Sequence, residues 1–337
     1  MRKIKWGVIG CGGIAKNRTI PGMLLTDNCE VVAVQDVKED VAKAVQEQFN
    51  VKYSVTSVEE LLNIDEIEAV YIASPLFCHK EQVIKCAEMK KHVLCEKPLG
   101  LNGEEVEEMI SACKKADVKF GVAFMSRFQS HHVKIKEIVE TGVLGELVSI
   151  KAQWSFEYPE LNVWRQDIKL GGGGGFMDVG SHSIDILRFM TGLEAEEVVA
   201  ITGNQIFKYS VEDTSQLLAK MNNGAVMYIS ANYNMQTEPY RFEICGTKGC
   251  IVGEETFSQT PFYSKAYIKM VGEEKQPINF DGEFANTYTA ETSAFAKAII
   301  EGTPAPVDAY EGLQAQRIID AAYISANTGM RTKVKKD

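Results

Sequence analysis

One lysine stands where acid–base chemistry is possible. Lys97 lies in the tetrapeptide CEKP (residues 95–98), directly after an apolar run that predicts a buried strand. Pro98 lacks a backbone donor and restricts the conformation of Lys97, which predicts a stiff junction between strand and loop. A lysine held beside another positive charge has a lowered pKa and can exchange a proton with a hydroxyl group. The alternative is a solvated surface lysine, the usual state of this residue type.

A second polar group follows five consecutive glycines, Gly171 to Gly175. Asp178, His182 and Asp185 are spaced by four and then three residues, which predicts that they share one face of a helix. His182 can serve as general acid or base near neutral pH, with Asp178 fixing its orientation. The glycines give the backbone freedom to approach a ligand or to hinge. The alternative is a helix with Asp178 as its N-terminal cap and His182 as a core histidine.

The N-terminal segment has the pattern of a dinucleotide-binding turn. Gly10, Gly12 and Ala15 form GxGxxA between an expected strand, Ile4 to Ile9, and an expected helix. The first glycine permits the tight turn, the second lets the backbone approach a diphosphate, and the helix N-terminus supplies donors. Asp36 ends the next strand, where a carboxylate can accept hydrogen bonds from ribose hydroxyls. The alternative is that the glycines only close the turn and that Asp36 caps the following helix.

Asp36 also bears on the choice between the two nicotinamide dinucleotides. Its carboxylate would repel the 2′-phosphate of NADP, although Lys38 could partly compensate. The sequence therefore predicts NAD, with NADP as the minority choice.

The first 125 residues alternate short β-branched runs with helical patterns, which predicts a parallel sheet flanked by helices. The expected strands are Ile4–Ile9, Val31–Asp36, Ala69–Ala73, His92–Cys95 and Lys119–Phe124. Helices are expected from about Ile14, Lys38, Ser57, His79 and Asn102, and Ser57 with Glu60 fits a capping box.

After an expected helix at Ser130–Glu140, longer alternating segments predict a mostly antiparallel sheet. Its expected strands are Leu147–Phe156, Ala200–Phe207, Ser215–Met221, Ala225–Tyr233 and Tyr240–Cys245. Asn223-Gly224 predicts a hairpin with a type I′ turn, and residues 246–249 predict another turn. Helical patterns return at Thr289–Glu301 and Ala309–Thr328.

Composition excludes several classes of protein. Lys and Arg number 36 against 46 Asp and Glu, and the net charge of −10 repels nucleic acid and anionic lipid. The apolar N-terminal stretch is broken by glycines before it reaches the length of a signal peptide or membrane span, which predicts a cytoplasmic protein. Eight scattered cysteines without a CxxC pair predict reduced, structural thiols, with neither a disulfide framework nor a metal site.

Five segments, taken in order, resemble the glucose-fructose oxidoreductase and inositol dehydrogenase (Gfo/Idh/MocA) family. They are VIGCGGIA (residues 8–15), Asp36, YIASP (71–75), CEKP (95–98) and GGGFMDVGSHSID (173–185). The resemblance implies a Rossmann domain over residues 1–125 and an α/β domain with a large, mostly antiparallel sheet over 126–337. It also implies that the last helix, 309–328, packs back on the Rossmann domain, and that the protein is a dimer or tetramer through the large sheet.

The resemblance assigns roles to individual residues. Lys97, Asp178 and His182 match a catalytic trio that, with NAD or NADP, oxidises or reduces a hydroxyl or carbonyl carbon of a sugar, cyclitol or cyclic diol. Trp164 and Arg165 match a pair that lines the substrate pocket together with this trio, and the alternative for the pair is cation–π packing. The implied cofactor contacts are Gly10, Gly12, Gly13, Ile14, Asp36, Ser74, Pro75, His79, Glu96 and Lys97, with Glu96 at the nicotinamide ribose. For His79 a role at the helix start is an equal alternative.

Two other functions stay open at this point. The first is a dinucleotide or sugar sensor that keeps the fold without catalysis, because fold does not determine function. The second is a glycoside hydrolase that uses tightly held NAD for transient oxidation, as a minority of related proteins do. The substrate itself, the direction of the reaction and the number of subunits do not follow from the sequence.

Overall fold

The computed structural model describes residues 2–236, 240–255, 265–280 and 286–336. The chain divides into two compact units, the first of residues 1–125 and 285–313, the second of residues 126–284 and 314–337. The resemblance implied a second domain that continues from 126 to the C-terminus, whereas the structure groups 285–313 with the first unit. The reason is packing: Phe295 lies with its ring centroid 5.8 Å from that of Trp6, and Thr289 donates a hydrogen bond of 3.0 Å to the carbonyl of Gly22.

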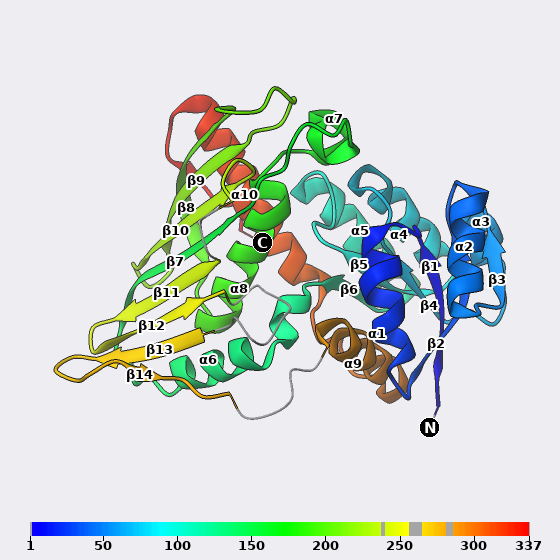
Figure 1. Cartoon of the computed structure of the whole chain (residues 1–337), viewed down its shortest axis with the longest axis horizontal. Helices are drawn as coiled ribbons and strands as arrows, with labels where there is room; N and C mark the ends of the chain where they lie inside the picture. Colours follow the sequence, from blue (N-terminus) through cyan, green and yellow to red (C-terminus); the bar gives the residue numbers. More distant parts are fainter. Residues whose placement is uncertain (1, 237–239, 256–264, 281–285, 337) are drawn as a thin grey trace. The chain divides into compact units, whose positions relative to one another are not determined.

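Unit 1 is a parallel six-stranded sheet in the order β3-β2-β1-β4-β5-β6, with helices between successive strands (Figure 1). Its strands are β1 (Ile4–Ile9), β2 (Cys29–Gln35), β3 (Tyr53–Val55), β4 (Ala69–Ile72), β5 (His92–Glu96) and β6 (Phe120–Ala123). Its helices are α1 (Ile20–Leu24), α2 (Glu39–Phe49), α3 (Val58–Leu62), α4 (His79–Glu88), α5 (Gly103–Ala116) and α9 (Thr287–Glu301). The strand order reverses between β1 and β4, and ligands of such sheets bind outside the carboxyl ends of the strands at this point.

The five strands predicted for this unit are confirmed within two residues at each end. The capping box at the start of α3 is confirmed, because Glu60 N–H donates to Ser57 Oγ over 3.1 Å and Ser57 N–H donates to Glu60 Oε2 over 3.2 Å. Strand β3 was not predicted. It is only three residues long and half-buried at the sheet edge, so it lacks the apolar pattern of its neighbours.

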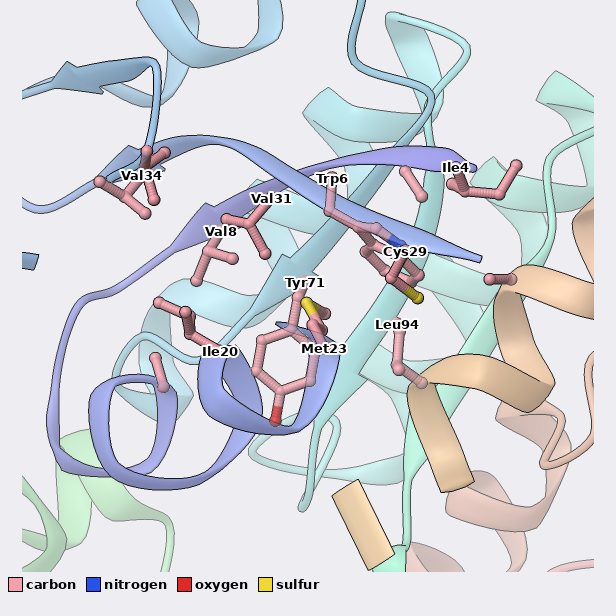
Figure 2. Packing of buried hydrophobic residues seen from close by; sticks show 14 of the residues in the cluster. Ile4, Trp6, Val8, Ile20, Met23, Cys29, Val31, Val34, Tyr71 and Leu94 are labelled. Atoms are coloured by element: carbon pink, nitrogen blue, oxygen red, sulfur yellow. The ribbon is translucent and has the colours of Figure 1, made fainter. Parts of the chain in front are cut away.

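The core of unit 1 explains why these segments are strands. Ile4, Trp6 and Val8 of β1 are fully buried, as the continuous apolar runs of a sheet covered on both faces require. Ile20 and Met23 of α1 lie beside the apolar side chains of this sheet (Figure 2). This packing holds the carboxyl end of β1 in a defined place.

The described part of unit 2 forms a nine-stranded sheet in the order β14-β13-β12-β11-β7-β10-β9-β8-β15. Its strands are β7 (Leu147–Ser155), β8 (Ala195–Gly203), β9 (Thr214–Met221), β10 (Val226–Asn232), β11 (Arg241–Gly246), β12 (Gly249–Glu254), β13 (Lys265–Met270), β14 (Gln276–Pro277) and β15 (Thr332–Lys333). Its helices are α6 (Ser130–Glu140), α7 (Ile168–Gly171), α8 (Ser181–Thr191) and the larger part of α10 (Ala309–Thr328). Among the strands that the structure describes in this sheet, only β7 and β10 pair in parallel, and α6 and α8 lie on one side of the sheet (Figure 1). The predicted fold class is confirmed.

Strand β8 differs from the prediction of Ala200–Phe207. It starts five residues earlier, at Ala195, and ends at Gly203. The carboxylate of Asp213 accepts hydrogen bonds from the backbone N–H groups of Gln205, Ile206 and Phe207, which turns this segment into a loop.

The hairpin at Asn223-Gly224 is confirmed, but the predicted turn type is wrong. A type I′ turn needs positive φ at both central residues, whereas here Gly224 has φ +89° and Asn223 does not have a positive φ. Gly224 N–H donates to the carbonyl of Met221 over 2.9 Å, and Met221 N–H donates to that of Ala225 over 2.8 Å. The connection is therefore a turn followed by one left-handed glycine.

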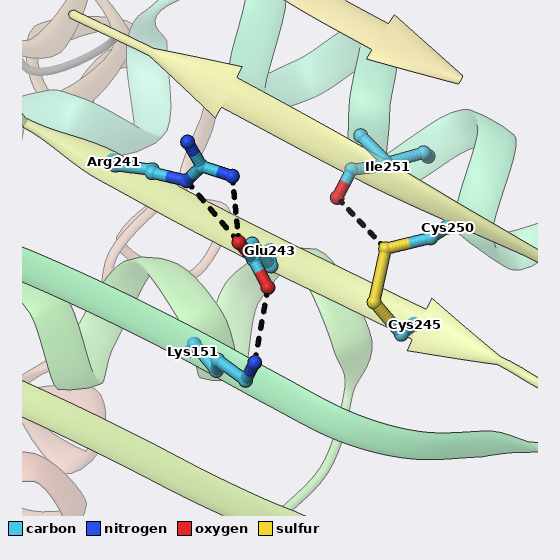
Figure 3. Close-up of a disulfide and its surroundings, with 6 residues drawn as sticks. All are labelled: Lys151, Arg241, Glu243, Cys245, Cys250 and Ile251. Carbon is cyan, nitrogen blue, oxygen red and sulfur yellow. Dashed lines mark hydrogen bonds and ion pairs between the residues drawn. A yellow bond between two sulfur atoms is a disulfide. The ribbon is translucent and has the colours of Figure 1, made fainter. Parts of the chain in front are cut away.

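The prediction that all cysteines are reduced is wrong for one pair. Cys245 and Cys250 form a disulfide across the β11–β12 hairpin (Figure 3), because the turn at 246–249 places them directly opposite each other. The same view shows the ion pairs of Glu243 with Lys151 and Arg241, at 3.1 and 2.7 Å. The free cysteines are Cys11, Cys29, Cys78, Cys86, Cys95 and Cys113.

Two further observations concern the described residues alone. They contain no cluster of three or more His, Cys, Asp and Glu side chains suited to a metal ion. None of the helices they form has the length and apolar character needed to cross a bilayer.

Candidate functional site

The glycine turn after β1 is dictated by a close approach to β4. Gly10 has φ +86°, and a Cβ at this position would lie 2.7 Å from the backbone nitrogen of Ser74 and 2.8 Å from the carbonyl oxygen of Ala73. Its N–H donates to the carbonyl of Gln35 over 2.8 Å. Only glycine fits there, so this residue closes the turn at the reversal point of the sheet.

Gly12 and Gly13 have a different reason to be glycine. A Cβ on Gly12 would meet no described atom within 4 Å, and one on Gly13 would meet only the Asn17 amide at 3.8 Å. Open space therefore lies over the backbone that starts the following helix, a π-helical turn at Ala15–Thr19 entered through Ile14. A diphosphate can approach this backbone and accept from the N–H groups at the helix start, so these residues fit a dinucleotide.

Asp36 connects the glycine turn to the next helix. Its Oδ2 accepts from the N–H of Cys11 over 3.0 Å, and its Oδ1 accepts from the N–H of Lys38 over 3.0 Å. The N-cap of α2 is Lys38, so Asp36 is not the helix cap that the alternative interpretation proposed. Its carboxylate joins the backbone of the glycine turn to that of Lys38.

His79, the first residue of α4, clamps two loops. It is buried, and its Nε2 lies 3.0 Å from the carbonyl oxygen of Ser74, while its Nδ1 lies 3.1 Å from that of Pro98. Ser74 Oγ donates to Gln82 Oε1 over 2.6 Å. The loop that follows β4 through Ser74-Pro75 is therefore tied to the loop that follows Lys97, and His79 has a positioning role.

Strand β5 ends at Glu96, and Lys97 follows it, at the same edge of the sheet as the glycine turn. The phenol of Tyr71, on the neighbouring strand β4, donates to Glu96 Oε1, and Lys97 N–H donates to Glu96 Oε2 over 3.3 Å. Thr19 Oγ1 donates in turn to the Tyr71 hydroxyl over 3.0 Å. Burial, with the charge of Glu96, raises the pKa of Tyr71 well above its usual value, so the phenol stays protonated as a donor. The Lys97–Pro98 peptide bond is cis.

In unit 2, Asp178 lies in a π-helical turn (Phe176–Gly180) directly before α8. Its Oδ2 accepts a hydrogen bond of 2.9 Å from the hydroxyl of Tyr233, which is fully buried and whose pKa is raised by burial and then by the Asp178 charge. Asp178 is therefore not the helix cap that the alternative interpretation proposed, since its carboxylate is oriented by a phenol.

His182 lies in the first turn of α8 and is 6% exposed. Its ring stacks on Trp154 of β7 with centroids 5.1 Å apart, and Trp154 contacts Tyr240 at 5.0 Å. The indole fixes the plane of the imidazole. That Asp178 also orients His182 stays a prediction.

The glycine run has another role than the predicted freedom to hinge or approach a ligand. A Cβ on Gly173, Gly174 or Gly175 would lie 1.9 to 2.3 Å from atoms of Tyr323, Glu212 and Ala231. Protein atoms fill the space that side chains would need. The run is thus a packing requirement that brings the backbone ahead of Asp178 against the sheet.

Glu212 holds this run, and the sequence analysis missed it. Its Oε2 accepts from Gly174 N–H over 2.9 Å, and its Oε1 accepts from Phe176 N–H over 3.1 Å and from the Tyr323 hydroxyl over 2.8 Å. Burial raises the pKa of Glu212, although these hydrogen bonds oppose the rise. No motif marks this acid, because the donors Gly174, Phe176 and Tyr323 lie 36 or more positions away from it.

Asp185, third in the helical series, is structural. It forms a bidentate ion pair with Arg127, with Arg127 Nη2 2.6 Å and Nε 3.0 Å from Asp185 Oδ1. The two side chains are 1% and 10% exposed, and Arg127 also lies over the ring of Phe189. This pair fastens α8 to the segment before α6.

Trp164 and Arg165 form a 3₁₀ turn after β7, with the guanidinium 4.3 Å from the centre of the indole. The cation–π alternative is therefore confirmed as a contact, and it leaves Arg165 exposed. Nearby, burial raises the pKa of Tyr158, while the charge of Arg165 opposes the rise and that of Asp178 adds to it. The charges of Arg165 and Asp178 thus both affect the pKa of Tyr158.

The predicted residues fall into two groups, one on each unit. Unit 1 brings the cofactor residues together at one sheet edge: Gly10 contacts Ser74, Cys11 contacts Asp36, and His79 joins the loops after β4 and β5. Unit 2 carries Trp164, Arg165, Asp178 and His182.

Family models match both halves of the chain. Residues 4–124 match the model "Oxidoreductase family, NAD-binding Rossmann fold", and residues 132–252 match the "GFO/IDH/MocA C-terminal domain". The myo-inositol 2-dehydrogenase of Thermotoga maritima is 30% identical over 92% of both chains, and the 1,5-anhydro-D-fructose reductase of Ensifer adhaerens is 29% identical over 88% of both. The solved structure of the aldose-aldose oxidoreductase from Caulobacter crescentus, complexed with glycerol, matches with a TM-score of 0.92 at 26% identity, covering 98% of this chain and 100% of that one.

Proposed function

Because the chain belongs to the Gfo/Idh/MocA family of oxidoreductases, with its NAD-binding Rossmann domain, we propose that it transfers a hydride between NAD and a hydroxyl or carbonyl carbon of a sugar, cyclitol or related cyclic diol. The observation that carries this proposal is the open backbone at Gly12, on a sheet edge that also presents Asp36 and Lys97. Its relatives that act on an inositol and on an anhydrosugar support the substrate class.

The residues that would hold the cofactor share the edge of unit 1. Gly12, Gly13 and Ile14 offer backbone N–H groups to the diphosphate, Asp36 accepts from the adenosine ribose, and Glu96 accepts from the nicotinamide ribose. Ser74, Pro75 and His79 shape the loop alongside. NAD, when bound, supplies the hydride acceptor. The negative charge of Asp36 favours NAD over NADP.

Besides the hydride acceptor, the reaction needs a group that takes up the proton of the substrate hydroxyl. In the oxidative direction the amine of Lys97 would accept the proton of the substrate hydroxyl. His182, whose ring plane is fixed by Trp154, would serve as a second proton carrier that exchanges protons with solvent, and Asp178 would favour its charged form. Trp164 and Arg165 position the rest of the substrate.

The test is Lys97→Ala, with Lys43→Ala on the exposed surface of α2 as the matched control. We expect Lys97→Ala to bind NAD within about threefold of the wild type and to lose about 10²- to 10⁴-fold in kcat on a sugar or cyclitol, while the control keeps both. NADH absorbance measures turnover and calorimetry measures binding. Normal turnover by Lys97→Ala refutes the role of this lysine. Tight NAD binding by the wild type without turnover on any polyol points to a sensor, and cleavage of an aryl glycoside without net NADH points to a hydrolase.

We also propose that two copies associate through the face of the large sheet that carries exposed apolar side chains. Val199, Ile201, Leu218 and Val226 share that face on β8, β9 and β10, and each is 41 to 70% exposed. An apolar patch of this kind marks an interface. Light scattering should give a dimer or tetramer for the wild type and smaller species for Leu218→Asp, and a monomeric wild type contradicts the proposal.

A further inference from the structure

Unit 2 carries a cavity of about 450 Å³ beside the Trp164 turn, between the loop that follows β7 and the loop that follows β8. Trp164, Leu170 and Tyr209 supply its apolar and aromatic lining. Phe207 stacks on Tyr209 with ring centroids 5.5 Å apart, which supports that wall. The volume lies in the range of small-molecule sites, and an aromatic face suits the C–H groups of a sugar ring.

The remaining lining is rich in hydrogen-bonding groups. Asn162 contributes an amide, Lys208 an ammonium group, and Glu160 and Asp167 contribute carboxylates. One oxygen of each carboxylate accepts a backbone N–H, of Lys208 and Lys169 respectively, so both carboxylates are held in place. Donors and acceptors around an aromatic wall are what a ring bearing several hydroxyls needs.

The indole of Trp164 connects this cavity to the residues of unit 2 that are proposed to contact the substrate. The guanidinium of Arg165 lies 4.3 Å from the centre of the indole ring, and Arg165 is not among the residues that line the cavity, whereas Trp164 is. Burial raises the pKa of Tyr158, and the charge of Arg165 opposes this rise. The ring centroid of Tyr158 lies 5.0 Å from that of Tyr233, and the Tyr233 hydroxyl donates to Asp178 over 2.9 Å. A substrate held at Arg165 can thus extend along Trp164 into the cavity.

We propose that this cavity binds the second, non-reacting ring of a neutral disaccharide or glycoside, so that the natural substrate is larger than a monosaccharide. This inference rests on the proposed function and narrows its substrate class. The two carboxylates outnumber the single ammonium group in the lining, which disfavours a second unit that carries a carboxylate or phosphate.

The experiment compares matched substrate pairs in the full-length enzyme with NAD. Glucose and 1,6-anhydroglucose are each measured beside their α- and β-glucosides, and a glucuronosyl derivative serves as the charged probe. The variants are Lys208→Ala and Asn162→Gly. Glycine suits residue 162 because Asn162 has φ +51°. Lys169→Ala, an exposed lysine of α7 outside the cavity lining, is the matched control.

We expect at least one neutral glucoside to exceed its parent monosaccharide in kcat/KM by about tenfold or more, as one or two additional hydrogen bonds would produce. Lys208→Ala and Asn162→Gly should each remove most of this advantage, keep monosaccharide turnover within about twofold, and weaken glucoside binding measured calorimetrically without NAD. Lys169→Ala should change none of these values.

Several outcomes overturn the proposal while the proposed function survives. The first is monosaccharide turnover with no gain in kcat/KM for any glucoside. The second is that Lys208→Ala and Asn162→Gly lose kcat/KM equally on a glucoside and on its parent monosaccharide. The third is a higher kcat/KM for the glucuronosyl probe than for the neutral glucosides. If no saccharide is turned over, calorimetry decides: glucoside binding that Lys208→Ala abolishes supports the cavity, and absence of binding overturns it. Loss of turnover on all saccharides would by itself contradict only the proposed function.

Discussion

Glu212→Gln removes one charge from the interior of unit 2 with almost no change in shape. In the wild type both carboxylate oxygens accept: Oε2 from Gly174 N–H, and Oε1 from Phe176 N–H, the Tyr323 hydroxyl and the Ser215 hydroxyl. A glutamine has one acceptor oxygen, which should take the position with three donors. Its NH₂ group then faces Gly174 N–H, and two donors meet where a hydrogen bond of 2.9 Å existed.

The magnitude follows from this exchange. A lost hydrogen bond to a charged acceptor costs about 1.5–3 kcal/mol, and a buried donor without a partner costs about 1–3 kcal/mol. The amide avoids part of the desolvation that raises the pKa of Glu212, so the net loss should be about 2 kcal/mol at neutral pH. For a domain of this size that corresponds to a fall in Tm of about 4–8 °C.

The pH dependence has a definite sign. Because the folded state raises the pKa of Glu212 above its ordinary value of 4.5, folding favours the protonated form. The stability that this proton contributes is fully present below about pH 4.5 and is lost as pH rises through the folded pKa. Glutamine has no such proton, so the deficit of Glu212→Gln against the wild type should be larger near pH 5 than near pH 8.

Thermal melts by circular dichroism over this pH range test the reasoning. Glu140→Gln, which breaks only an exposed ion pair on α6, is the control and should stay within about 0.5 kcal/mol of the wild type. Glu212→Gln should also lose about tenfold in kcat, because the glycine run positions Asp178, while its NAD affinity stays unchanged. Equal melting temperatures for Glu212→Gln and wild type, or a deficit that grows with rising pH, would refute this account.

Three further perturbations have defined outcomes. Asp185→Asn should destabilise unit 2 by about 3–5 kcal/mol in chemical denaturation, because it removes the negative charge that the buried guanidinium of Arg127 faces. Burial lowers the pKa of His132 well below its ordinary value, so folding favours the neutral imidazole. The stability that His132 contributes is therefore present above about pH 6.5 and is lost as the pH falls below that value. The Tm of the wild type should fall more steeply toward pH 5.5 than that of His132→Asn. Asp36→Ala should weaken NAD binding about tenfold by calorimetry while the affinity for NADP falls less, and equal losses for both would remove Asp36 from the choice of cofactor.

Much of unit 1 was predictable because its signals are local. A continuous apolar run such as Ile4–Ile9 must be covered on both faces, and a Ser57/Glu60 pair closes its hydrogen bonds within one helical turn. The glycine turn is equally local, since Gly10 and Gly12 stand in one short motif. Strand β3 escaped because an edge strand of three residues carries almost no pattern.

Unit 2 shows where local reasoning ends. The glycine run looks flexible in sequence, yet its lack of side chains is demanded by Tyr323, Glu212 and Ala231, which come from three distant segments.

The disulfide was overlooked although Cys245 and Cys250 flank a predicted turn, and the hairpin register alone would have placed them opposite each other.

The amino-acid sequence by itself determined the two kinds of sheet, the dinucleotide turn and the family membership, because each depends on residues close together along the chain. Only the tertiary structure decided what holds each acid: Arg127 pairs with Asp185, Glu212 holds the glycine run, and Tyr233 donates a hydrogen bond to Asp178. The physical reason is that a carboxylate's role is set by its desolvation and by the donors around it. Those donors arrive from segments that no spacing rule connects.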